Sequence, residues 1–127
     1  MTNIDLTQNA IVAANDEYEE MSFADIFNDK CDEIHNSNAS KGFWEEPREF
    51  GTLIALVHSE LSEALEADRK NKMDEHLTHR PGLEVELADA VIRIMDIAGA
   101  YQLDIGGALE EKLSYNSTRE YKHGKRY

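Results

Sequence analysis

The sequence predicts an all-α fold, a bundle of four to five helices. Two prolines and seven glycines in 127 residues leave little room for the many turns of a β protein. In several stretches, apolar residues recur three and four positions apart, which is the period of an amphipathic helix. One further stretch, residues 83–101, is apolar almost all round and long enough for a central helix packed on several sides. A chain of this length suits one domain.

Composition narrows the function classes. The formal charge of −13 argues against duplex DNA or an anionic membrane as the main partner, because both repel an acidic surface. The single cysteine, Cys31, excludes an intrachain disulfide and a cysteine zinc cluster and suits a reducing cytosol. The sequence shows no signal peptide and no apolar run of membrane-spanning length, so we expect a cytoplasmic protein.

Two segments come before the central part of the chain. Residues 1–21 are polar and are expected to form an N-terminal arm or a short helix, while residues 22–127 form the main domain. Residues 22–39 predict a helix, because Ser22 and Asp25 have the spacing of a capping box. Cys31 lies in the apolar stripe of this helix, so we expect it to be a small buried residue and not a nucleophile.

A loop over residues 36–47 contains Lys41, Gly42, Phe43 and Trp44, the only tryptophan. An aromatic pair beside a lysine is suited to stacking on a nucleic acid base. The alternative is that the two rings close one end of a helix bundle, because aromatic side chains account for much of the apolar surface buried in a core. Composition alone favours this alternative.

A strong helix is predicted from Arg48 to about Lys70. Leu53, Leu56, Glu60 and Glu63 are spaced three, four and three, so the two glutamates continue a row that begins in the core. The connector over residues 69–82 is hydrophilic and ends in Pro-Gly. Its two histidines, His76 and His79, are three apart but have no third ligand nearby, which indicates a solvated loop and not a metal site.

The apolar helix over residues 83–101 carries one polar stripe, formed at the same spacing by Glu86, Asp89, Arg93 and Asp96. A short last helix is expected from Ile105 to Leu113. The tail then gathers cations in an otherwise acidic chain: Lys112, Arg119, Lys122, Lys125 and Arg126.

The two carboxylate pairs are the strongest chemical signal. If their helices pack antiparallel, Glu60, Glu63, Glu86 and Asp89 converge. A set of oxygen ligands without cysteine or histidine suits Mg²⁺, with Mn²⁺ as the alternative. Such a site suits phosphoryl transfer, with the cationic tail adding phosphate contacts. The competing interpretation is that the first pair is a solvated face and the second pairs with Arg93 and other bases.

These residues resemble a known signature. Glu60-x-x-Glu63, 22 intervening residues and Glu86-x-x-Asp89 are similar to the motif of the MazG-like all-α nucleoside triphosphate pyrophosphohydrolases, which are related to the dimeric dUTPases. The loop Lys41-Gly-Phe-Trp44 and the tail from Lys112 to Lys125 resemble that family too. The resemblance covers roughly residues 22–127.

The resemblance implies a helical bundle that assembles as a homodimer or a dimer of dimers. It also implies Mg²⁺-dependent cleavage of a (d)NTP between the α and β phosphates, which gives a (d)NMP and pyrophosphate. Glu60, Glu63, Glu86 and Asp89 would be metal ligands, and Glu63 or Glu60 would also orient the attacking water. The substrate-binding residues implied are Lys112, Asn116, Arg119, Lys122, Lys125 and Trp44.

Two other function classes stay open on the sequence. One is a non-catalytic helical interaction module. The other is a carboxylate-bridged di-iron oxidase, which would need Glu-x-x-His on two core helices. Glu120-x-x-His123 lies in the polar tail and Asp32-x-x-His35 at a helix end, so the oxidase is disfavoured.

Overall fold

A computed structural model describes residues 20–127. Between residues 21 and 127 it contains four α-helices and no strand, which confirms the predicted all-α class. The helices are α2 (Phe23–Ser40), α3 (Phe50–Lys70), α4 (Gly82–Tyr101) and α5 (Ile105–Ser117), and a short 3-10 turn follows at Tyr121–Gly124. The N-terminal arm expected over residues 1–21 lies almost wholly outside the described residues.

The chain divides into two compact units. Among the described residues, the larger unit spans residues 28–104, and the smaller contains residues 20–27 and 105–127. Each unit is described by itself. None of the helices in residues 20–127 combines the length and the apolar character needed to cross a membrane.

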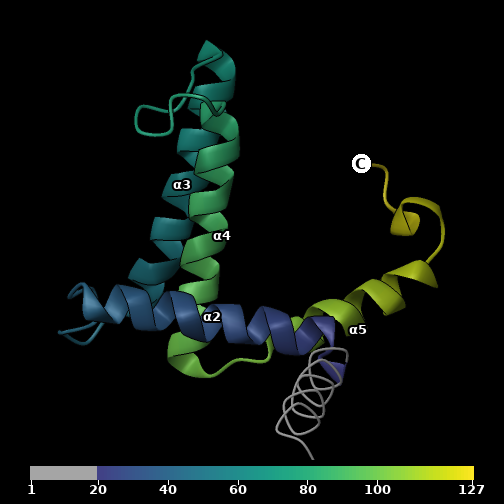
Figure 1. Cartoon of the computed structure of the whole chain (residues 1–127). Coiled ribbons are helices and arrows are strands. Elements are labelled where there is room, and N and C mark those ends of the chain that lie inside the picture. The colour runs from purple at the N-terminus through teal and green to yellow at the C-terminus, as the bar shows by residue number, and fades with distance from the viewer. Residues whose placement is uncertain (1–19) are drawn as a thin grey trace, which may run out of the picture. The chain divides into compact units, whose positions relative to one another are not determined.

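The larger unit is built on an antiparallel pair, α3 and α4, which lie side by side along their lengths (Figure 1). α3 ends where Asn71 turns into the left-handed conformation and its backbone N–H caps the carbonyls of Ala67 and Asp68. The last turn of α3 carries two cations, Arg69 and Lys70, which stabilise the helix because they lie at the negative end of its dipole. The antiparallel packing brings the carboxylates predicted on α3, Glu60 and Glu63, next to Glu86 of α4.

Helix α2 begins with the predicted capping box. The Asp25 backbone N–H donates to Ser22 Oγ at 3.1 Å, and the Ser22 N–H donates to Asp25 Oδ2 at 3.4 Å. From Asn28 onward, α2 crosses the α3–α4 pair at the end opposite the connector (Figure 1). Cys31 is buried there, and burial raises the pKa of its thiol, which fits the predicted role as a small apolar residue.

The core of the described residues is small. Its buried apolar members are Cys31, Leu53, Ala64, Ala67, Ala90, Met95, Ile97 and Ala98. The expectation that residues 83–101 are packed on several sides is wrong for the single chain, because Leu87, Val91 and Ile94 are 44%, 48% and 44% exposed. The reason is that α3 covers one side of α4, while α2 reaches only its last turns.

Candidate metal centre

Three carboxylates from two helices meet in the larger unit. Glu60 and Glu63 of α3 and Glu86 of α4 each offer one oxygen, and these oxygens all lie within 4.8 Å of one another. The spacing of three residues places the first two on one face of α3, and the antiparallel packing brings Glu86 opposite them. The cluster therefore has the donor atoms and the dimensions of a site for a hard divalent cation.

Glu60 is held in place from α4. It is 9% exposed, and its Oε1 accepts a hydrogen bond of 2.7 Å from Nε of Arg93. The charge pair fixes the glutamate side chain across the helix interface and leaves its second oxygen for another ligand. The sequence offered Arg93 as a partner for the second carboxylate pair, whereas the structure pairs it with Glu60 of the first.

Glu86 is the carboxylate least satisfied by the protein. Its Oε2 is buried and has no hydrogen-bond partner among the described residues. Burial, followed by the charge of Glu63, raises the pKa of Glu86 to about 7. A buried anion without a partner is costly, so the group stays partly protonated at neutral pH unless a cation binds beside it.

Asp89 lies one turn further along α4 and borders the same region. Its pKa is raised by burial, by the charge of Glu60 and by the charge of Asp74 in the connector. Arg93 opposes this shift. The fourth residue of the predicted ligand set is therefore within the electric field of the cluster, although its oxygens are not part of the three-carboxylate group.

Asp96, the last residue of the α4 stripe, has a different environment. It is 6% exposed and accepts hydrogen bonds from three donors: Asn38 Nδ2 at 3.0 Å, Trp44 Nε1, which lies 3.1 Å from each carboxylate oxygen, and His35 Nδ1 at 2.9 Å, in the tautomer that carries the hydrogen on Nδ1. These donors come from α2 and from the loop after it. Asp96 is thus occupied by protein donors and anchors the aromatic loop.

The sequence reasoning missed this network. Asp32-x-x-His35 was considered only as a ligand motif, and Trp44 only as a base contact or an end plug. The structure shows the Trp44 indole N–H engaged by Asp96, one ring face near the Arg48 guanidinium at 4.9 Å and the His35 ring edge-on at 5.0 Å. The available signal was an apolar helix whose polar stripe carries three carboxylates, Glu86, Asp89 and Asp96, and only one arginine.

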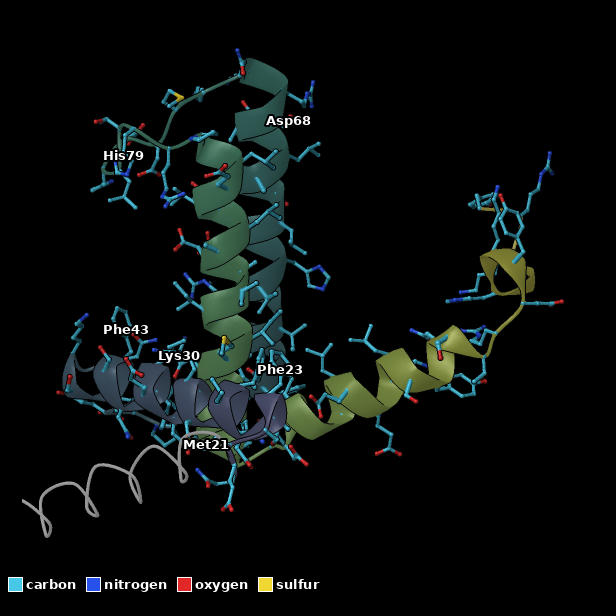
Figure 2. The ribbon with its side chains drawn as sticks, turned by 45° about the vertical axis from the view of Figure 1, so that its right-hand side comes forward. Met21, Phe23, Lys30, Phe43, Asp68 and His79 are labelled. Carbon is cyan, nitrogen blue, oxygen red and sulfur yellow. The ribbon has the colours of Figure 1, made fainter. Side chains whose placement is uncertain are left out.

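Two cavities border the carboxylates. One has a volume of about 490 Å³ and is shared between the carboxylates and the connector. The other, of about 290 Å³, shares Glu60 and Asp89 with the first and extends to Phe43, Arg48 and Ile92. Figure 2 shows Phe43 and the connector residue His79 at opposite ends of the α3–α4 pair. The candidate metal centre therefore opens on two sides that differ in their lining.

The basic tail belongs to the smaller unit. The Lys112 ammonium of α5 and the guanidinium of Arg119, which follows α5, lie 4.7 Å and 5.7 Å from the Tyr115 ring centroid. Asn116 Oδ1 is buried without a partner among the described residues. In the turn that follows, Lys122 adopts a left-handed backbone conformation with its ammonium 5.8 Å from the Tyr121 ring. These predicted substrate contacts form a cationic and aromatic surface within their own unit.

Comparison of the chain with protein-family models, with curated proteins and with solved structures found no match. The function is therefore inferred from the geometry of the carboxylates and from the sequence motif.

Proposed function

We propose that this chain is a Mg²⁺-dependent nucleotide pyrophosphohydrolase, which cleaves a (d)NTP between the α and β phosphates to give a (d)NMP and pyrophosphate. The observation that carries the proposal is the meeting of three carboxylates from α3 and α4, with one buried oxygen of Glu86 left without a partner. The resemblance to the MazG-like pyrophosphohydrolases adds the reaction type.

The residues present fit a divalent cation. The donors are carboxylate oxygens alone, which suits Mg²⁺ or Mn²⁺ better than zinc. Glu60, Glu63, Glu86 and Asp89 would hold the ion, and the repulsion that raises the pKa of Glu86 would be relieved by its charge. When bound, the ion neutralises phosphate charge and makes a coordinated water more acidic.

The chain's own side chains would do the positioning. Arg93 fixes Glu60, so the buried member of the first pair keeps one geometry. Glu63 is the most exposed member of the cluster and is the residue we propose to orient the attacking water. In the proposal, the Trp44 ring forms part of the base pocket, and Lys112, Asn116, Arg119, Lys122 and Lys125 contact phosphate or sugar.

The proposed enzyme assembles with copies of itself. Large apolar side chains on the two long helices are left exposed in the single chain, among them Leu61, Leu65, Leu83, Leu87, Val91 and Ile94. A soluble protein rarely exposes so many on one helix pair. The partner we propose is a second copy of the chain, so that two α3–α4 pairs complete the bundle.

The test is a pyrophosphate-release assay with Mg²⁺ over all canonical (d)NTPs and several modified ones. Glu63→Gln and Asp89→Asn are expected to abolish release, because each removes a charged ligand and keeps the side-chain shape. Asp68→Asn is the matched control and should retain wild-type activity, because Asp68 lies at the connector end of α3 (Figure 2) and lines neither cavity at the carboxylates. Full activity in both site variants would refute the assignment of the site.

A further inference from the structure

The cavity of about 490 Å³ has one wall that the sequence did not assign to the site. Residues 71–81, the connector, supply this wall opposite the carboxylates. The cavity is lined by Glu60, Glu63, Glu66, Ala67, Lys72, Met73, Asp74, Glu75, His76, Gly82, Glu86 and Asp89. The connector is exposed, as the sequence predicted for a solvated loop, and its residues Lys72 to His76 also border the candidate metal centre.

The first part of the connector is fixed to both helices. The Lys72 N–H donates to the Ala67 carbonyl at 3.0 Å, and the Gly82 N–H donates to the Lys72 carbonyl at 2.8 Å. A Cβ at Gly82 would lie 3.0 Å from the Lys72 carbonyl oxygen and 3.1 Å from the Ala67 Cβ, so the chain passes close at this point. The backbone of Lys72 is therefore held between the end of α3 and the start of α4.

The outer part of the connector is organised around Asp74. Its Oδ2 accepts hydrogen bonds from the backbone N–H groups of Leu77 at 2.6 Å and His76 at 3.0 Å, and its own N–H donates to the Arg80 carbonyl at 2.9 Å. These bonds stabilise a turn of defined shape. The connector wall of the cavity therefore has a conformation fixed by hydrogen bonds.

Lys72 differs in charge from the acidic residues around it in the cavity. Among the described residues that line the cavity, it is the only lysine or arginine, and its ammonium forms no ion pair within residues 20–127. Lys70, two positions earlier, pairs with Glu66 and does not line the cavity. An exposed cation in an acidic cavity is placed to bind an anionic ligand that enters beside the metal centre.

The two cavities differ in the apolar part of their lining. Both are lined mostly by polar and charged residues, but the apolar members are Ala67, Met73 and Gly82 in the connector cavity and Phe43 and Ile92 in the cavity of about 290 Å³. The Phe43 ring and the Ile92 side chain are surfaces suited to a base and a sugar. We propose that the connector cavity holds the diphosphate leaving group of the (d)NTP, with Lys72 bonded to one of its phosphoryl oxygens. This inference rests on the proposed function.

The test measures binding separately from turnover. Pyrophosphate is titrated into the full-length protein by calorimetry in the presence of Mg²⁺. Lys72→Met is expected to weaken pyrophosphate binding and raise the KM for the nucleotide about tenfold, the size expected for one hydrogen bond to a charged group. Lys72→Arg should retain most of the affinity for pyrophosphate, and Lys70→Met should retain all of it. The affinity of each variant for Mg²⁺ alone should equal that of the wild type.

The outcomes separate the two proposals. If the enzyme releases pyrophosphate from a nucleotide and Lys72→Met matches the wild type in both pyrophosphate affinity and KM, the role of Lys72 is wrong and the proposed function stands. If no nucleotide is cleaved but pyrophosphate binds through Lys72, the proposed reaction is wrong and the binding site stands. Absence of both cleavage and binding overturns both.

Discussion

At the scale of single residues, Asp96 is the clearest case of a buried carboxylate that is fully used by the protein. Its carboxylate, on α4, accepts hydrogen bonds from the His35 ring, the Asn38 amide and the Trp44 indole N–H. Buried polar groups left without partners destabilise a fold far more than a satisfied pair stabilises it. Asp96 therefore determines where the loop after α2 lies, and through it where Trp44 lies.

Replacing Asp96 with alanine should destabilise the protein, because the Trp44 and Asn38 donors lose their acceptor. We expect the free energy of unfolding to fall by about 3 kcal/mol, from two or more part-buried donors left unpaired. Urea unfolding followed by the fluorescence of Trp44, the only tryptophan, measures this directly. Glu84→Gln, an exposed change on the same helix, should be near neutral, and an equal loss in both variants would contradict the role of Asp96.

Glu86 has the opposite position, since its buried Oε2 has no hydrogen-bond partner among the described residues and its neighbours Glu60 and Glu63 are acidic. Its pKa is about 7 in the folded chain, against 4.5 for the unperturbed group, so the folded state holds the proton more tightly than the unfolded state. The stability that comes from this group is therefore complete below pH 4.5 and is lost as the pH rises through 7. Above that range the ionised group destabilises the metal-free protein.

Glu86→Gln should therefore stabilise the metal-free protein at pH 8, by about 1 kcal/mol or more, because one unit of pKa shift corresponds to ~1.4 kcal/mol. The same change should remove the rise in Tm that Mg²⁺ gives the wild type. Thermal unfolding with EDTA and with Mg²⁺ at pH 5 and pH 8 measures both effects. A variant that is less stable than the wild type in EDTA at pH 8 would show that Glu86 is not strained by its neighbours.

At the scale of elements, α2 and α4 approach closely at Gly99. A Cβ there would lie 2.6 Å from both the Cys31 carbonyl oxygen and the His35 Cβ, distances at which something must shift. Gly99→Ala should therefore lower the free energy of unfolding, by about 1–3 kcal/mol for an overpacked contact. Because Asp96 and His35 meet one turn away, the change should also alter the fluorescence of Trp44.

Gly51→Ala is the matched control on α3. An added Cβ there meets only Glu49 Oε1, at 3.8 Å, so the substitution has room. It should stabilise the helix by ~0.5–1 kcal/mol, because alanine is the better helix former. Denaturant unfolding of the two variants checks the contrast, and a destabilised Gly51→Ala with an unaffected Gly99→Ala would invert the packing inferred for α2 and α4.

The sequence predicted elements better than their contacts. The Ser22–Asp25 box marked the start of α2, and the row from Leu53 to Glu63 placed two carboxylates on one face of α3, because both signals are local. The partners of Asp96 lie 52 to 61 residues away along the chain, so no local pattern reveals them. The connector is exposed, as predicted, but its hydrogen bonds around Lys72 and Asp74 could not be predicted, because they depend on two helix ends meeting.

At the scale of the whole molecule, the apolar character of α4 is explained only in part by the single chain. Its interior half faces α3, yet Leu87, Val91 and Ile94 remain exposed. Exposed apolar area of this kind favours association, at about 25 cal/mol for each Å² removed from water. These exposed apolar residues lie on α4, the helix that also carries Glu86 and Asp89. We therefore expect self-assembly and the proposed activity to be linked.

The wild-type protein should therefore sediment as a dimer or a larger closed assembly at micromolar concentration. The double variant Leu87→Asp with Val91→Asp should sediment as a monomer, because burying two carboxylates in an interface costs more than the lost contacts alone. Loss of pyrophosphatase activity should accompany dissociation, since the α3–α4 pair then lacks its packing partner. Analytical ultracentrifugation measures the change, with Tyr127→Asp, at the exposed end of the tail, as the control for a carboxylate added outside the apolar face. A wild type that is monomeric at these concentrations would contradict self-assembly and would leave the apolar face of α4 to a different protein partner.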